Sequence, residues 1–121
     1  MIKKEIKKAK VHRLRFAAKN KQTWDFIVSG KKKIETRAGT VKYQRVKKGD
    51  TLMLCCGKNH LEKKVKNVKH FKSISSLIKV YKPAIINPGT TTLKEMEAMY
   101  YSYPGYKEKI KEFGILAFEL E

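Results

Sequence analysis

The apolar residues of this chain come in runs of only a handful, separated by glycine, proline and short polar turns. The clearest run is Thr-Leu-Met-Leu-Cys-Cys at 51–56, which follows a Gly-Asp turn and has the length of a buried strand. A membrane-spanning helix needs about 20 consecutive apolar residues, so we expect no segment to cross a bilayer. A chain of 121 residues is long enough for one domain with a sizeable core.

Short segments that alternate apolar and polar residues, or that are apolar throughout, predict the strands. We expect strands over residues 11–16, 33–37, 41–46, 51–56, 61–71 and 114–120. Helices are predicted where apolar residues recur at spacings of three and four behind a capping residue, at Asn20, Ser73 and Thr92. Five or six strands with two or three helices, not in strict βαβ order, indicate an α+β fold with a small mixed sheet or barrel. We expect residues 1–10 to form a basic N-terminal arm and residues 11–121 a single domain.

The net charge of +18 is concentrated in the first two thirds of the chain. Residues 1–82 carry 25 Lys and Arg against five Asp and Glu, whereas residues 83–121 carry four against six. A folded domain of this composition presents a strongly positive face, which attracts polyanions and releases counterions from their phosphates. The charge therefore predicts nucleic acid or another polyanion as the partner, without separating RNA from DNA, while an acidic protein partner stays open as a weaker alternative.

The sequence lacks the signatures of several other classes of protein. The basic start is not followed by the apolar stretch of a signal peptide, so we expect a cytoplasmic protein, with a nuclear one as the alternative. The adjacent Cys55 and Cys56 do not suit a disulfide with each other and fit a reducing compartment. Together with His12, His60 and His70 they do not have the spacing of a metal site. We expect no metal, no cofactor and no membrane partner.

The densest chemistry lies in Gly-Lys-Lys-Lys-Ile-Glu-Thr-Arg at 30–37. Alternate side chains of a strand share a face, so we expect Lys33, Glu35 and Arg37 to project together and Lys32 to project to the opposite side. A carboxylate between two cations is held in its ionised form. Taken alone, the segment is most simply interpreted as a solvated edge strand whose charges discourage aggregation, with a binding site as the alternative.

This segment is part of a longer pattern. Its spaced residues are Trp24, Ile27, Gly30, Lys32, Glu35 and Arg37, followed by Val-Lys-Lys-Gly-Asp at 46–50. Val-Lys-His-Phe at 68–71, Tyr-Pro-Gly at 103–105 and Gly-Ile-Leu-Ala-Phe-Glu-Leu at 114–120 complete it. From Val11 onward the chain resembles the ASCH domain (activating signal cointegrator homology). The resemblance implies a PUA-like fold, a small β-barrel with helices beside a cleft, and a role in RNA binding.

The resemblance also implies that Lys32, Glu35 and Arg37 line the cleft, with Gly30 allowing the turn from helix into strand. Tyrosines beside a basic cleft can stack on unpaired bases, and Tyr103 is the best candidate to do so. The lysine-rich run at 61–72 is expected to offer a basic ribbon. The candidate nucleic-acid-binding residues are therefore Lys32, Lys33, Glu35, Arg37, Arg45, Lys69, Lys72 and Tyr103. Trp24 is expected to pack in the core or in the wall of the cleft.

Some ASCH proteins are enzymes. The bacterial acetylcytidine amidohydrolases resemble this chain around the same motif, and they use a Lys, a Thr and a Glu. Lys32 matches their Lys, but Glu35 stands where their Thr would be, and residues 87–92 contain no Glu at the place of theirs. We therefore expect a binding protein rather than an enzyme. The alternative is a hydrolase of the ribonuclease or amidohydrolase type that acts on RNA or a modified nucleoside through Lys32 and Glu35.

Overall fold

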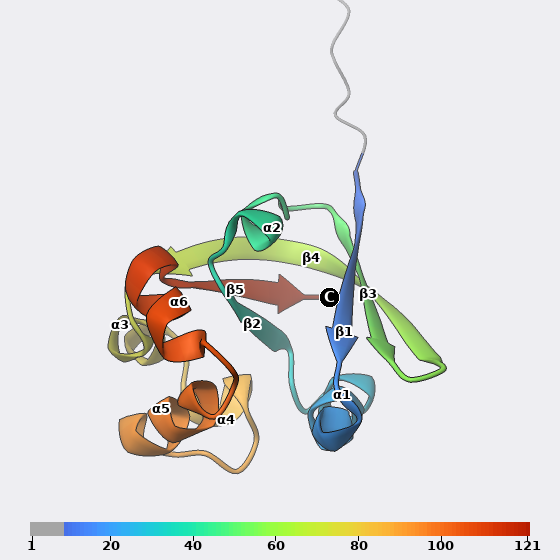
Figure 1. The fold of residues 1–121 in the computed structure, drawn as a ribbon. Coiled ribbons are helices and arrows are strands. Elements are labelled where there is room, and N and C mark those ends of the chain that lie inside the picture. The colour runs from blue at the N-terminus through green and yellow to red at the C-terminus, as the bar shows by residue number, and fades with distance from the viewer. Residues whose placement is uncertain (1–8) are drawn as a thin grey trace, which may run out of the picture.

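The computed structural model describes residues 9–121, so residues 1–8 of the expected N-terminal arm lie outside the described residues. The fold is α+β, as predicted, with a curled five-stranded sheet that forms half of a barrel and helices packed beside it (Figure 1). In chain order the elements are β1 (Val11–Phe16), a 3₁₀ turn (Ala18–Asn20), α1 (Lys21–Val28), β2 (Ile34–Ala38), α2 (Val41–Gln44), β3 (Thr51–Cys56), β4 (Asn59–Phe71), α3 (Ile74–Val80), α4 (Pro83–Ile86), α5 (Leu93–Tyr101), α6 (Tyr106–Phe113) and β5 (Ile115–Leu120).

The strands lie in the order β1-β3-β4-β5-β2, so β1 and β2 are the two edges of the sheet. β1 runs parallel to β3, and the other neighbours are antiparallel. The long β4 pairs with β3 through its first half and with β5 through its second half, and its register with β5 shifts between Val65 and Asn67. An irregularity of this kind bends a strand, which lets one sheet curl until its two edges approach each other.

Two clusters of buried residues lie on the two faces of the sheet. The first fills the concave face and is centred on Leu14, Leu54 and Phe118, with Trp24 of α1 closing one end. The indole Nε1 of Trp24 donates a hydrogen bond to the Leu54 carbonyl at 3.1 Å, so the prediction that this tryptophan packs in the core is confirmed. The second cluster packs α3, α4, α5 and α6 onto the outer face of β2 and β5 (Figure 1). The sheet therefore has no free apolar face within the described residues.

The helix starts at Ser73 and Thr92 are confirmed. The Ser73 hydroxyl accepts from the Ser76 N–H, and the Thr92 hydroxyl accepts from the Glu95 N–H, both at 3.1 Å. Asn20 also precedes a helix, as predicted, but its side chain makes no capping hydrogen bond.

Two predictions about the elements were wrong. Residues 41–46 do not form a strand, because the Thr40 carbonyl accepts from the N–H groups of Tyr43 and Gln44 and closes a helical turn there. Within residues 9–121 there are also six α-helices rather than two or three. Two of the additional helices, α2 and α4, have only four residues and offer no periodicity to detect. The third, α6, was missed although Tyr106, Ile110 and Phe113 have helical spacing. Among these helices none combines the length and apolar content that a bilayer crossing requires.

Candidate nucleic-acid-binding site

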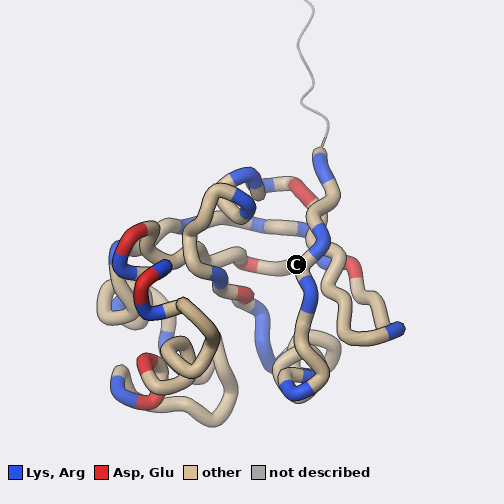
Figure 2. The backbone as a smooth tube through the Cα atoms, in the orientation of Figure 1, with Lys and Arg blue, Asp and Glu red and all other residues tan. Residues whose placement is uncertain are grey.

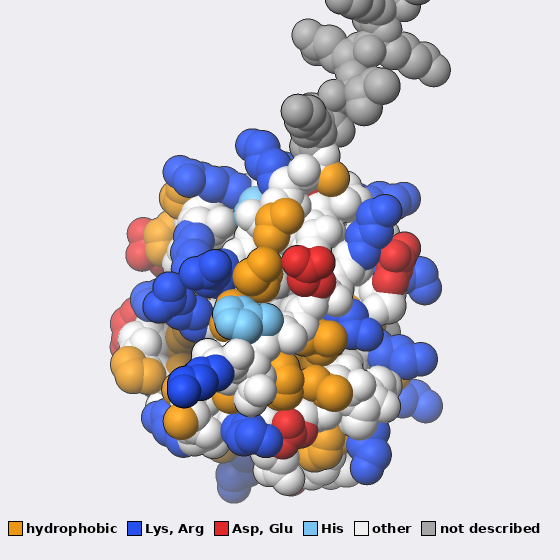
Figure 3. All heavy atoms as spheres, turned by 90° about the vertical axis from the view of Figure 1, so that its right-hand side faces the viewer, with side chains coloured by type: hydrophobic (Ala, Val, Ile, Leu, Met, Phe, Trp, Pro, Cys, Tyr) orange, Lys and Arg blue, Asp and Glu red, His pale blue; other side chains and the backbone are white. Residues whose placement is uncertain are grey.

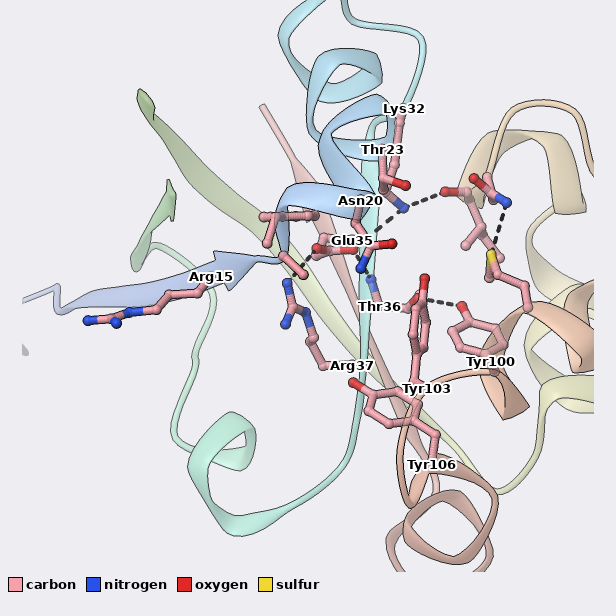
Figure 4. A pocket seen from close by; sticks show the side chains of 15 residues that line it. Arg15, Asn20, Thr23, Lys32, Glu35, Thr36, Arg37, Tyr100, Tyr103 and Tyr106 are labelled. Atoms are coloured by element: carbon pink, nitrogen blue, oxygen red, sulfur yellow. Dashed lines mark hydrogen bonds and ion pairs between the residues drawn. The ribbon is translucent and has the colours of Figure 1, made fainter. Parts of the chain in front are cut away.

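A pocket of about 240 Å³ opens between the two edge strands of the half-barrel. The end of β1 and the start of α1 form one wall, β2 forms the floor, and the end of α4, α5 and the turn after α5 form the opposite wall (Figure 4). Because β2 is an edge strand, side chains from both of its faces reach the pocket: Glu35 and Arg37 from the concave face and Thr36 from the outer face.

Lys32 and Glu35 form a buried ion pair in the floor of the pocket. Their side chains are 3% and 5% exposed, and the Lys32 Nζ lies 3.5 Å from the Glu35 Oε1. The same ammonium donates to the Ile34 carbonyl at 2.5 Å and to the Ile86 carbonyl of α4. Burial lowers the pKa of Lys32, and the Glu35 carboxylate acts in the opposite direction. The ammonium thus donates to two carbonyls and pairs with one carboxylate, which ties β2 to α4.

This pair corrects the prediction that Lys32 projects away from Glu35. β2 begins only at Ile34, so Lys32 belongs to the turn after α1, and the alternation of a strand does not apply to it. The turn depends on Gly30, which has φ of +80°, a conformation that residues with a side chain rarely adopt. The Lys32 N–H then bonds back to the Phe26 carbonyl of α1 at 2.9 Å.

Arg37 lies on the other side of Glu35 and stays partly accessible. Its Nη2 is 3.2 Å from the Glu35 Oε2, and its side chain is 15% exposed. The guanidinium also lies 5.0 Å from the centre of the Phe16 ring and 5.7 Å from that of Tyr43, so it spans the gap between β2 and β1. Burial opposes the charged form, but Glu35 and nearby phenols raise the pKa of Arg37 overall. Arg37 is therefore a cation with donors that face the pocket.

Tyrosines form the helical wall of the pocket (Figure 4). Tyr100 is 2% exposed, and its hydroxyl is hydrogen-bonded to the Thr36 hydroxyl, so it belongs to the core. Tyr103 and Tyr106 are partly exposed and meet edge to face, with ring centres 5.2 Å apart and planes at 75°. Burial raises the pKa of both phenols, so they stay neutral at physiological pH.

The free edge of β2 is covered by side chains instead of by another strand. The Ile34 carbonyl accepts from Lys32, and the Thr36 N–H donates to the Glu35 Oε1 at 2.9 Å. The Ala38 N–H donates to the Tyr106 hydroxyl at 3.5 Å, a long contact. Edge strands with unsatisfied backbone groups invite pairing with other chains, so these side chains have a structural role beside any role in binding. The segment is thus an edge strand, as expected, but it is not solvated, because Lys32, Glu35 and Thr36 are buried.

The structure brings together only half of the predicted binding residues. Lys32, Glu35, Arg37 and Tyr103 line the pocket, as the resemblance implied for the first three. The other four, Lys33, Arg45, Lys69 and Lys72, lie outside it, and all are exposed.

Lys33 does not share the environment of Glu35 and Arg37, because it precedes β2 and stays exposed while the other two turn into the gap between the sheet edges. Lys69 pairs with Glu119 at 3.7 Å and lies 5.4 Å from the centre of the Tyr81 ring, beside the helix-covered face of the sheet. These two lysines stay predicted nucleic-acid-binding residues, but neither belongs to this pocket.

Sequence reasoning missed the residues that complete the pocket. These are Arg15 and Phe16 at the end of β1, Asn20 and Thr23 around the start of α1, and Asn87, Met99 and Tyr106 on the helical wall. They lie beside β2 because strands that are far apart in the sequence pair with each other. No local sequence pattern reveals such pairings. No group of three or more His, Cys, Asp or Glu side chains within residues 9–121 is arranged to hold a metal ion.

No family model matches the chain, and no curated protein matches it. Solved structures do resemble it over most of its length. The crystal structure of hypothetical protein PH0355 is 27% identical, has a TM-score of 0.78, and the alignment covers 93% of this chain and 97% of that one. The solution structure of protein PF0455 from Pyrococcus furiosus is 25% identical, with a TM-score of 0.69 over 92% and 96% of the two chains. These similarities support the α+β fold with its curled sheet, and they name no activity.

Proposed function

We propose that this chain is a nucleic-acid-binding protein of the ASCH type, with a PUA-like fold, and that it holds an unpaired RNA base in the pocket between β1 and β2. The observation that carries the proposal is the composition of this pocket. Arg37 and Arg15 stand at one side and the rings of Tyr103 and Tyr106 at the other, on a chain of net charge +18. Single-stranded RNA is recognised by such pairs of basic and aromatic side chains.

The size of the pocket supports one base or one nucleoside as its occupant. Pockets for drug-sized ligands measure roughly 300–1,000 Å³, and this one measures about 240 Å³. A base inside a duplex is stacked and paired, so it cannot enter a recess of this kind without being flipped out. Asn20, Thr23 and Asn87 lie around the recess and offer hydrogen-bonding groups for the edge of a base or for a 2′-hydroxyl.

The proposal is tested by the binding of a fluorescein-labelled oligouridylate, measured by anisotropy at near-physiological salt, with the variants Tyr103→Ala and Tyr101→Ala. Tyr101 is the matched control, because it is 39% exposed and lies outside the pocket. Stacking on one base is worth about 1–3 kcal/mol, so Tyr103→Ala should raise the Kd at least about fivefold, and Tyr101→Ala should leave it unchanged. Equal affinities of both variants and the wild type, or no binding at all, would refute the proposal.

A hydrolase is the second candidate, and the buried pair favours it. Lys32 and Glu35 lie 3.5 Å apart in the pocket, where an ammonium could stabilise charge on a phosphate and a carboxylate could move a proton. The pair ranks second because the ammonium already has three acceptors. Incubation of the RNA with the protein, followed by a denaturing gel, tests ribonuclease activity, and chromatography of acetylcytidine tests the amidohydrolase. Product that Glu35→Gln abolishes, without loss of the fold, would make the chain an enzyme.

A further inference from the structure

A second groove runs beside the free edge of β1. It is formed by β1 on one side and by α2 with the residue after it on the other, and Arg13, Arg15, Lys42 and Arg45 all line it. No Asp or Glu is among its lining residues. The tube view shows the basic positions of β1 and of α2 with its following turn in the same upper part of the molecule (Figure 2). The function proposed above does not use this groove.

The arginines of the groove are accessible to a ligand. On β1 the burial pattern alternates, so Leu14 and Phe16 enter the core while Arg13 and Arg15 stay exposed. Residues two apart on a strand lie about 6.6 Å from each other, which is close to the separation of neighbouring phosphates in an extended single strand. Arg45 is also exposed.

The groove adjoins the pocket. Arg15 lines both of them. Tyr43 lies in the wall of the groove, and its ring is 5.7 Å from the guanidinium of Arg37, which lines the pocket. A polymer that places one residue in the pocket can therefore run along the edge of β1 and stay in contact with positively charged side chains.

We propose that this groove binds the sugar–phosphate backbone of a single strand whose unpaired base occupies the pocket. The inference rests on the proposed function and extends it from one base to a path for the polymer. The occupant is the backbone rather than further bases, because the groove offers cations but no free aromatic face. Of its two aromatic rings, Tyr43 already has Lys42 at 5.3 Å and Arg37 at 5.7 Å, and His12 is held by Asp50 at 2.8 Å.

The distribution of charge over the rest of the surface agrees with this path. On the face to the right of Figure 1, Lys and Arg side chains outnumber acidic ones and surround a less charged centre (Figure 3). Positive charge of this extent attracts any polyanion, so it brings the strand to the protein without selecting the groove. The test must therefore separate the groove from the general charge.

The experiment measures binding of labelled oligouridylates of two, four and eight residues over a range of salt concentrations. The test variant is Arg13→Gln/Arg45→Gln. The control variant is Lys58→Gln/Lys79→Gln, which removes the same charge from exposed sites outside both the groove and the pocket. Each phosphate contact to a single strand contributes about 0.7 to the slope of log K against log salt. The groove variant should lose about 1.4 of this slope and bind the eight-residue strand up to about 25-fold more weakly, because each exposed ion pair is worth up to about fivefold.

The two-residue strand should be affected much less than the longer ones, since it occupies the pocket and little of the groove. Equal slopes and affinities for the groove and control variants would overturn the inference, even if Tyr103→Ala weakens binding and so supports the pocket. Binding by an acidic peptide that competes with the eight-residue strand and depends on the same two arginines would also overturn it, in favour of a protein partner. If wild-type protein binds none of the strands, the proposed function fails and the groove inference fails with it.

Discussion

Replacement of Lys32 by methionine should destabilise the protein by about 3 kcal/mol. The change keeps most of the volume of the side chain but removes the donor to two buried carbonyls and one partner of Glu35. Breaking a buried ion pair by removing one partner costs about 3–5 kcal/mol, because a charge remains buried without compensation. The lower end applies here, since Arg37 still lies 3.2 Å from the other oxygen of that carboxylate.

The free energy of unfolding can be followed by urea titration with tryptophan fluorescence, because Trp24 is the one tryptophan and is 9% exposed. A loss of about 3 kcal/mol corresponds to a fall in Tm of roughly 10–15 °C for a domain of this size. A measured loss below about 1 kcal/mol would refute the reasoning, since Lys32 would then not hold β2 to α4. The double variant Lys32→Met/Glu35→Gln should lose about 1–2 kcal/mol less than the sum of the two single variants.

Two further predictions concern other parts of the fold. Asp50 is 6% exposed and accepts from the Lys47 N–H at 2.9 Å and from His12 at 2.8 Å, contacts that outweigh its burial and lower its pKa. The contribution of Asp50 to stability is therefore present above the unfolded pKa of about 3.9. It is lost as the pH falls through the lower pKa of the folded state. The Tm measured from pH 7 to pH 2 should therefore drop at the acid end, and it should drop less in Asp50→Asn. Gly114 has φ of +74°, and a Cβ there would lie 2.3 Å from the Phe71 carbonyl oxygen, so Gly114→Ala should cost more than about 3 kcal/mol in urea unfolding. Gly57→Ala, also at positive φ but with no neighbour within 4 Å, should cost only about 1–2 kcal/mol, and equal losses in the two variants would contradict the clash.

The strands of this fold are largely predictable from sequence because their signals are local. The run at 51–56 is bounded by a turn, and its burial depends on its own apolar residues. Residues 41–46 misled the prediction, because the β-branched Val41 and Val46 favour a strand, whereas the backbone closes a helical turn on the Thr40 carbonyl and the Gln44 side chain donates to the Gly39 carbonyl at 2.7 Å. A hydrogen bond from a side chain to the backbone of a turn produces no repeating pattern of apolar residues, so the sequence does not reveal it.

The candidate site was predictable only where its residues are neighbours in the chain. Glu35 and Arg37 share a face of β2, as strand alternation requires. The inward turn of Lys32 was not predictable, because a lysine without a partner in view is expected in solvent, and its acceptors include the Ile86 carbonyl, 54 residues away in sequence. The position of Lys69 relative to the pocket was not predictable for a related reason, since the face on which a charged strand residue lies follows only from the partner strand and its register.

These contacts give the residues of the pocket different roles. Lys32 has the most buried charge of the site, but its protons are held by the protein itself, so its loss would disturb the fold before it tests binding. Arg37 has its carboxylate partner on one side and an accessible guanidinium edge, and the surfaces that flank it differ in chemistry. The β1 and α2 side carries arginines and a lysine, whereas α5 and the turn after it present tyrosines. On our proposal, these two surfaces orient a nucleotide with its base towards Tyr103 and its phosphates towards β1. Variants of Tyr103 and of the groove arginines, rather than variants of Lys32, therefore separate recognition from stability.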